Sequence, residues 1–175
     1  CNEINTEVEP MLSFIGGTGP EGRGLALRFA LAGEQVLIGS RDEGRARDAA
    51  GSVSEHVSKN PVTGTLNEDA ARQGDIVFVA VPYGGHRDTL VSLREALTGK
   101  IVVDVVAPLA FNKGRASAIA VEEGSAALQA QAILSESTVV AAFQNVSARD
   151  LLAPDRPVDS DVVVCADDAE AKRVV

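Results

Sequence analysis

Three glycines between a short apolar run and an apolar helical pattern constrain this chain most. Gly17, Gly19 and Gly22 follow the apolar residues Leu12 to Ile15 at the spacing Gly-x-Gly-x-x-Gly. The first glycine of such a turn lets the chain leave a strand sharply, the second lets backbone approach a pyrophosphate, and the third lets helix and strand pack closely. The free N–H groups and the positive dipole end of the following helix then face the phosphates. The pattern therefore predicts a dinucleotide site rather than an ordinary glycine-rich turn.

Composition excludes several classes of protein. The 175 residues suffice for one domain with a sizeable core. The net charge of -9 argues against nucleic acid or an anionic membrane as partner, and an apolar run of about 18 residues, long enough to span a membrane, is missing. Residues 1–10 are expected to form a flexible tail without signal-peptide order, and residues 11–175 a single domain. Two cysteines make no disulfide framework, so a cytoplasmic protein is expected, with Cys165 a buried thiol.

Strand and helix patterns alternate along the whole chain. The expected strands are 12–15, 35–39, 62–66, the apolar run 75–82, 101–106, 138–143 and 161–165, and the expected helices are 20–32, 42–57, 68–73, 86–97, 122–134 and one from 167. Residues 107–117 are expected to be a loop, 144–160 to be irregular, and Asn67 to cap the helix 68–73. This alternation predicts an α/β fold, a doubly wound parallel sheet of the Rossmann type. Because the chain stops within its last helical pattern, we expect it to be truncated before a small C-terminal helical segment.

The residues after the second strand indicate which dinucleotide is bound. An NAD site usually carries Asp or Glu there, to accept hydrogen bonds from the ribose hydroxyls. This chain has Ser40 and Arg41, with Arg45 one helical turn further on. A hydroxyl and two guanidinium groups suit a 2′-phosphate, so we expect NADP rather than NAD. The alternative is that both arginines simply belong to a solvated helix face. Asp42 is the alternative ribose ligand, and we interpret it instead as the N-terminal residue of the next helix.

The ends of the later strands supply small, apolar and amide side chains. Val81, Pro82 and Tyr83 are expected to line a nicotinamide pocket, and the amides of Gln144 and Asn145 to hold a polar ring edge. Hydride passing directly between two rings needs positioning and no protein nucleophile. No metal spacing or nucleophile arrangement occurs, so we assign no catalytic residue and no metal ligand.

Two titratable residues near these strand ends receive structural interpretations. His86 is a candidate acid or base, but a histidine at the start of a helix is more often a solvent-exposed neighbour of the cap. Asp104 lies within a strand pattern, and we expect it to be a buried carboxylate with its hydrogen bonds satisfied.

Several stretches together resemble the NADPH:coenzyme F420 oxidoreductases, the F420-dependent NADP reductase family. They are Ile15-Gly-Gly-Thr-Gly-Pro-Glu-Gly-Arg-Gly-Leu-Ala-Leu-Arg, Gly39-Ser-Arg, Asn67-Glu-Asp-Ala-Ala, Val139-Val-Ala-Ala-Phe-Gln-Asn-Val-Ser-Ala and Val164-Cys-Ala-Asp-Asp-Ala-Glu-Ala-Lys. The resemblance runs from about Met11 to the end of the chain. The stretch Phe-x-Asn-Val-Ser-Ala is shared with related NADP-binding reductases, including metalloreductases.

The resemblance implies hydride transfer between NADPH and the deazaflavin coenzyme F420, in a homodimer when full length. It implies that the glycine turn binds the pyrophosphate, that the serine and arginines bind the 2′-phosphate, and that the later strand ends frame the nicotinamide. The cofactor-binding residues so expected are Gly17, Thr18, Gly19, Pro20, Glu21, Gly22, Ser40, Arg41, Arg45, Val81, Pro82, Tyr83, Ala107 and Ala148.

The identity of the hydride acceptor leaves alternatives open. Archaeal members of the family carry His-Thr-Ile-Pro after the sixth strand, where this chain has Gln144 to Ser147. A related NADP-dependent reductase of a flavin, an imine such as pyrroline-5-carboxylate, or a metal chelate is one alternative. A non-catalytic NADP-binding sensor module is the other.

Overall fold

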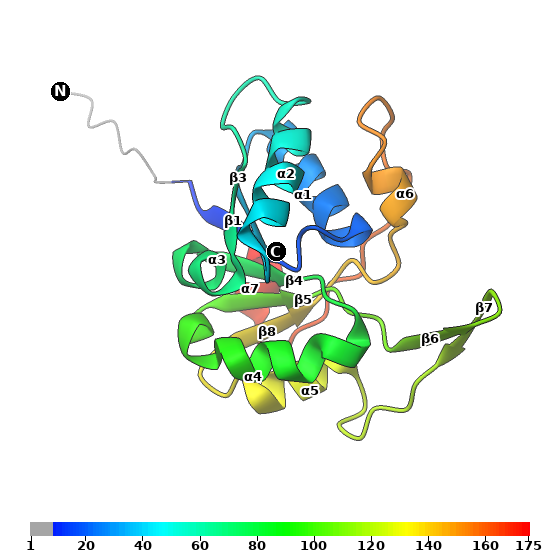
Figure 1. Cartoon of the computed structure of the whole chain (residues 1–175). Helices are drawn as coiled ribbons and strands as arrows, with labels where there is room; N and C mark the ends of the chain where they lie inside the picture. The colour runs from blue at the N-terminus through cyan, green and yellow to red at the C-terminus, as the bar shows by residue number, and fades with distance from the viewer. Residues whose placement is uncertain (1–8) are drawn as a thin grey trace.

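A six-stranded parallel sheet forms the centre of the protein in the computed structural model, which describes residues 9–175 (Figure 1). Its strands are β1 (Met11–Ile15), β2 (Gln35–Ser40), β3 (Thr63–Leu66), β4 (Ile76–Val79), β5 (Ile101–Asp104) and β8 (Thr138–Ala141). They lie in the order β3-β2-β1-β4-β5-β8, and every pairing is parallel. The predicted doubly wound sheet is thereby confirmed. Residues 1–8 of the predicted tail lie outside the described residues.

Helices cover both faces of this sheet. On one face lie α1 (Pro20–Ala32), α2 (Glu43–Ser54) and α6 (Ala148–Leu151), and on the other lie α3 (Asn67–Gln73), α4 (His86–Leu97) and α5 (Ala126–Ile133) (Figure 1). Alternate residues of a strand point to opposite faces, so Phe14 enters the first core and Ile15 the second. In the first core the rings of Phe14 and Phe78 stack with centroids 4.7 Å apart. Both faces of β4 are buried, as its unbroken apolar sequence predicts.

The strand order reverses between β1 and β4, and this reversal positions the site. Chain segments leaving the carboxyl ends of these two strands turn to opposite faces, which leaves a crevice between them. The glycine turn follows β1, and the 3-10 helix η1 (Tyr83–Gly85) follows β4 after three residues. Within residues 9–175, no helix has the length and apolar character needed to cross a membrane.

An antiparallel hairpin replaces the loop that was predicted for residues 107–117. Strands β6 (Leu109–Asn112) and β7 (Arg115–Ala118) pair with each other and form an arm that projects from the body of the protein (Figure 1). Their connection is Lys113 and Gly114, with φ of 49° and 79°, and a two-residue turn with positive φ at both positions matches the natural twist of a hairpin. All residues of both strands are exposed, so no buried face produces an alternating apolar pattern.

Three further expectations were wrong in part. The predicted helix 122–134 begins later, at Ala126, because the Ser125 hydroxyl accepts a hydrogen bond from the backbone N–H of Leu128 and caps it. The predicted strand 161–165 is reduced to one antiparallel bridge between Cys165 and Ala141, and the Cys165 thiol is exposed rather than buried. Residues 144–160, predicted to be irregular, contain α6, and the chain ends with α7 (Ala169–Val174).

Candidate functional site

The glycine turn is shaped by two positions where a side chain would collide with backbone. A Cβ on Gly17 would lie 2.7 Å from the carbonyl oxygen of Phe14, and a Cβ on Gly22 would lie 2.8 Å from the Cα of Gly17. The backbone N–H of Gly17 also donates to the carbonyl of Gly39, at 3.0 Å, which ties the turn to the end of β2. Gly17 is therefore required where the turn leaves β1, and Gly22 is required where α1 packs against the turn.

Gly19 differs, because the packing of the protein does not require it. Its φ is -73°, and a Cβ there would have Gly16 O at 3.6 Å as its nearest neighbour, which is an ordinary contact. Gly19 is the N-cap of α1, and no side chain caps that end of the helix. The absent side chain thus leaves the N-terminus of a 13-residue helix open to an anion.

A cavity of about 460 Å³ lies directly over this turn, and we call it the glycine-turn cleft. It is lined by Gly16, Thr18, Gly19, Ser40, Arg41, Asp42, Arg45, Asn67, Ala80, Val81, Pro82, Gly84, Gly85 and Thr89. Asn67 was not predicted as a site residue, and the prediction that it caps α3 was wrong, since Leu66 is the N-cap. The Asn67 side-chain oxygen instead accepts the backbone N–H of Gly16 at 3.2 Å. The position of Asn67 directly after β3 was the sequence signal that could have identified it as a site residue.

One end of the glycine-turn cleft carries the predicted hydroxyl and both predicted guanidinium groups. Ser40 is buried at the end of β2, whereas Arg41 and Arg45 are exposed. The Asp42 carboxylate accepts the backbone N–H of Arg45 at 2.9 Å and so caps α2. Its predicted role as the N-terminal residue of the helix is confirmed, and this capping bond occupies one of its two carboxylate oxygens.

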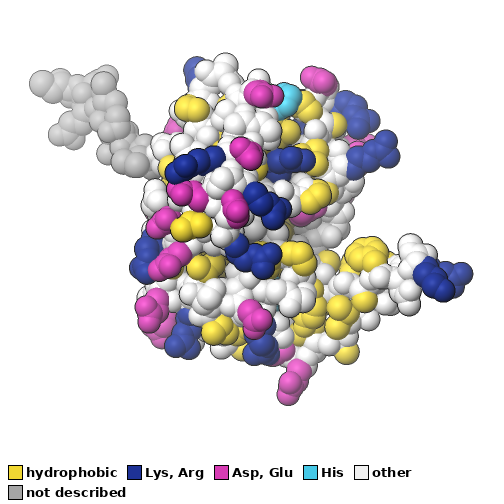
Figure 2. Space-filling model, viewed as in Figure 1, with side chains coloured by type: hydrophobic (Ala, Val, Ile, Leu, Met, Phe, Trp, Pro, Cys, Tyr) yellow, Lys and Arg dark blue, Asp and Glu magenta, His cyan; other side chains and the backbone are white. Residues whose placement is uncertain are grey.

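A second cavity, of about 420 Å³, continues from the first and reaches the arm. We call it the hairpin cleft, and it shares Gly19, Ala80, Val81 and Pro82 with the glycine-turn cleft. The rest of its lining is Pro20, Glu21, Tyr83, Val105, Val106, Ala107, Leu109, Phe111 and Gln144. Figure 2 shows hydrophobic side chains along the arm and basic ones at its tip. Together the two clefts form one trough across the carboxyl ends of the sheet.

Two residues of the hairpin cleft have unusual surroundings. Phe111 is 74% exposed although it is a large apolar side chain, so it offers a flat apolar surface beside the trough. In Glu21 the carboxyl atom Oε1 is buried without a hydrogen-bond partner. Burial raises the pKa of Glu21 above its usual value, because the charged form is poorly solvated there.

His86 and Asp104 form a buried pair beneath the hairpin cleft. The prediction that His86 is solvent-exposed was wrong, since its exposed fraction is 0%. Its Nε2 lies 3.0 Å from Asp104 Oδ2. The expectation that Asp104 is a buried and satisfied carboxylate is confirmed, because its second oxygen accepts the backbone N–H of Val106 at 2.9 Å. The position of His86 at the start of α4 did not predict its burial, because this start packs against Asp104 at the carboxyl end of β5.

Of the predicted cofactor residues, Ala148 lies apart from the others. It begins α6, which packs on α1, and it lines neither cleft. The Arg28 side chain of α1 fixes α6 there by donating to the backbone carbonyls of Asp150 and Leu151 at 2.7 and 2.8 Å. Gly17 in the turn and Gly22 in α1 also line neither cleft, and the remaining predicted residues line one cleft or both.

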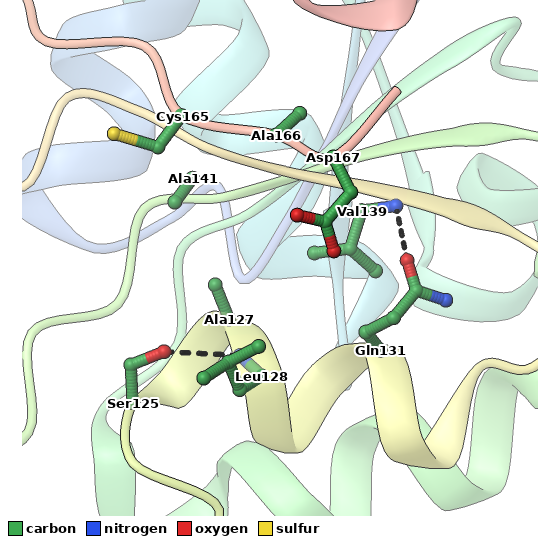
Figure 3. A pocket seen from close by; sticks show the side chains of 9 residues that line it. All are labelled: Ser125, Ala127, Leu128, Gln131, Val139, Ala141, Cys165, Ala166 and Asp167. Atoms are coloured by element: carbon green, nitrogen blue, oxygen red, sulfur yellow. Dashed lines mark hydrogen bonds between the residues drawn. The ribbon is translucent and has the colours of Figure 1, made fainter.

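A third cavity, of about 240 Å³, lies between α5, β8 and residues 165–167 and shares no residue with either cleft (Figure 3). Two of its polar side chains already bond backbone, since the Ser125 hydroxyl accepts from Leu128 N and the Gln131 side-chain oxygen accepts from Val139 N. The trough, rather than this groove, is therefore the candidate site.

The strand order, the glycine turn and the bare helix N-terminus define a dinucleotide-binding Rossmann protein. The sequence profile of the family described as NADP oxidoreductase, coenzyme F420-dependent, matches residues 11–108. The chain belongs to this family.

Three relatives illustrate the match. An F420-dependent NADP reductase of Methanocaldococcus jannaschii is 41% identical over 94% of this chain and 76% of its own length. One from Methanothermobacter thermautotrophicus is 41% identical over 93% of this chain and 73% of its own length. A crystal structure from Arthrobacter sp. FB24, described as an F420-dependent NADP reductase, is 29% identical with a TM-score of 0.75, and the match covers 95% of this chain and 77% of that one.

Proposed function

We infer that this protein is an oxidoreductase that transfers hydride between NADPH and coenzyme F420. Its family and its relatives support this activity. The observation that carries the inference is the continuous trough, whose two clefts share the small residues at the end of β4. Two ring systems must lie face to face for direct hydride transfer, and the shared residues let a dinucleotide anchored in the glycine-turn cleft bring its nicotinamide to a second ring in the hairpin cleft. When bound, NADPH supplies the hydride, and the deazaflavin takes it up together with a proton.

We propose that the glycine-turn cleft holds the phosphates of NADPH. Thr18 and Gly19 line this cleft, and the uncapped N-terminus of α1, where Gly19 carries no side chain, faces the pyrophosphate. Ser40, Arg41 and Arg45 hold the 2′-phosphate, because a dianion gains most from a hydroxyl donor and two guanidinium groups. We assign Asp42 to the cap of α2 rather than to the ribose, because one of its carboxylate oxygens accepts the backbone N–H of Arg45.

We propose further that the shared wall and the hairpin cleft hold the two rings. Val81, Pro82 and Ala107 give an apolar wall for the nicotinamide, and Tyr83 closes its edge. Leu109 and Phe111 extend this apolar lining along the arm, where a flat tricyclic ring gains burial. Gln144 supplies the one amide in the lining and suits the polar edge of a ring.

A spectrophotometric assay tests the function. NADPH is mixed with F420, FAD, FMN, pyrroline-5-carboxylate or a ferric chelate, and both NADPH oxidation and F420 bleaching are followed. Bleaching of F420 in proportion to NADPH consumed is the expected result. Tight NADPH binding with no turnover of F420 would refute it, and turnover of another acceptor would identify a different reductase. Binding without turnover of any acceptor would favour the sensor module.

The Phe111→Ser variant tests the role of the arm. It should raise KM for F420 severalfold and leave the Kd of NADPH unchanged, because Phe111 lines only the hairpin cleft. Val91→Ser, at another exposed apolar residue on α4, is the matched control and should change neither value. Equal effects of the two variants on KM would exclude a specific contact with the acceptor.

We also propose that the full-length protein is a cytoplasmic homodimer. The projecting arm supports this, because exposed apolar side chains on an arm are commonly covered by a second chain. Light scattering on the purified full-length protein measures the assembly, and a monomeric mass at micromolar concentration would refute it. Cell fractionation tests the location.

A further inference from the structure

A chain of hydrogen bonds runs from the floor of the hairpin cleft to the surface. Asp104 at the end of β5 pairs with His86, whose Nδ1 lies 3.3 Å from the side-chain oxygen Oε1 of Gln129 in α5. The Gln129 side-chain nitrogen donates to Glu123 Oε2 at 3.0 Å, and the other oxygen of Glu123 accepts from Arg87 at 2.6 Å. Asp104, His86 and Gln129 are buried, whereas Arg87 reaches solvent. We call these five residues the His86 network.

The acceptors at both ends of the imidazole determine its protons. Glu123 requires a donor, so the amide of Gln129 turns its nitrogen to Glu123 and its oxygen to His86. The His86 Nδ1 must then donate to that oxygen, and Nε2 must donate to the Asp104 carboxylate. An imidazole that donates from both nitrogens is an imidazolium cation. Burial by itself lowers the pKa of His86, but the hydrogen bond and charge of Asp104 outweigh it and raise the pKa above its usual value.

The inner end of the network holds the wall of the hairpin cleft. Asp104 Oδ1 accepts the backbone N–H of Val106, and the backbone carbonyl of Asp104 accepts the side-chain nitrogen of Gln144 at 2.7 Å. The ring of Tyr83 stacks on His86, with centroids 6.1 Å apart and planes at 27°. Val106, Gln144 and Tyr83 all line the hairpin cleft. Each of them is thus fixed by a residue of the His86 network, although His86 itself lines neither cleft.

The outer end of the network fixes the base of the arm. Glu123 lies in the segment between β7 and α5, and its bonds to Gln129 and Arg87 hold that segment against α4 and α5. The hydrogen bond from Gln129 is the main cause that lowers the pKa of Glu123, so its carboxylate stays charged. The network therefore connects the segment that follows β7 of the arm with the wall of the hairpin cleft.

We propose that His86 is a positioning residue for hydride transfer, which holds the nicotinamide-facing wall and the base of the acceptor arm in register as a buried imidazolium paired with Asp104. This role rests on the proposed function, since the wall matters only if two rings meet there. His86 touches neither ring, and its effect passes through Val106, Tyr83 and Gln144. A residue that acts in this way should affect the rate of transfer more than the binding of the remote phosphates.

The first test separates positioning from general structural support. His86→Leu removes both ring donors and keeps a buried apolar side chain, and His56→Asn is the matched control, because His56 is exposed. His86→Leu should lower kcat with F420 at least tenfold, with the Kd of adenosine 2′,5′-bisphosphate within twofold of the unmodified protein. His56→Asn should change neither value. An unchanged kcat, or an equal loss of kcat and of fragment binding, would overturn the positioning role.

The second test does not depend on turnover. The chain has two histidines, so in the His56→Asn background the imidazole signals in a nuclear magnetic resonance spectrum belong to His86 alone. At pH 7 both ring nitrogens should be protonated, and NADP⁺ should shift the His86 signals while adenosine 2′,5′-bisphosphate leaves them in place. A neutral ring, or signals unmoved by NADP⁺, would overturn the proposal. An inactive but correctly responding protein would instead refute the F420 activity and leave the network standing.

Discussion

Replacing Arg41 by alanine should weaken NADPH binding and leave NADH binding nearly unchanged. Arg41 lies with Ser40 and Arg45 at one end of the glycine-turn cleft, where the 2′-phosphate is proposed to bind. NADH lacks that phosphate, so it loses no contact when the guanidinium group is removed. The selectivity for NADPH over NADH is therefore the quantity that Arg41 should control.

The exposure of Arg41 determines the expected size of the effect. A hydrogen bond to a charged group contributes about 1.5–3 kcal/mol, and solvent screening favours the lower end for an exposed guanidinium. Arg45 also remains to hold part of the phosphate charge. A loss of about 1.5 kcal/mol corresponds to roughly a tenfold rise in the Kd of NADPH. The loss should shrink as ionic strength rises, because both groups are open to solvent.

Titration of NADPH fluorescence measures the effect, with NADH titrated in parallel. Arg47→Ala is the matched control, because Arg47 is exposed on α2, the helix that follows Arg41, pairs with Glu43 at 2.6 Å and lines neither cleft. It should leave both affinities within twofold. Equal losses of NADPH and NADH affinity in Arg41→Ala would refute the 2′-phosphate assignment, and so would an equal effect of Arg47→Ala.

Three other predictions concern the glycine turn, Glu21 and the buried histidine. Gly22→Ala places a Cβ 2.8 Å from the Cα of Gly17, so it should lower both the affinity for NADPH and the stability of the fold, the latter by about 1–3 kcal/mol. Gly19→Ala should lower the affinity alone. Thermal melting and NADPH titration check this, and equal losses of Tm in the two variants would contradict it. Glu21→Gln should strengthen NADPH binding by about 0.5–1 kcal/mol above pH 7, because it removes a negative charge beside the proposed pyrophosphate site. This gain should vanish at low pH, where Glu21 is protonated. NADPH titration at several pH values measures it, and a gain independent of pH would be evidence against this reasoning. The pKa of His86 is raised above 6.5 in the folded protein, so the stability that its charged form contributes is fully present below pH 6.5 and is lost as pH rises through the pKa of the folded state. Urea unfolding at a series of pH values should show this decline in the unmodified protein and not in His86→Leu.

Local sequence patterns determined the parallel sheet and the glycine turn. The turn was recognisable because close backbone contacts leave no room for side chains at Gly17 and Gly22, and this steric requirement appears in the sequence as a fixed spacing of glycines. The apolar run of β4 predicted a strand buried on both faces, since continuous apolar character is needed there. The position of Asp42 at the start of α2 was also predictable, because its capping hydrogen bond spans only three residues.

Only the tertiary structure decided which distant side chains meet. Asn67 accepts a hydrogen bond from Gly16, 51 residues away in the sequence, and His86 contacts Gln129, which is 43 residues away. Local sequence patterns therefore cannot predict either contact. The arm was missed because both of its faces are exposed and neither selects an alternating pattern. Cys165 and His86 show the same limit, since burial depends on what packs above a residue and not on its neighbours in sequence. Hence the sequence alone predicted the glycine turn as the dinucleotide site, whereas the wall and arm that are proposed to receive the second ring emerged only from contacts made across the sheet.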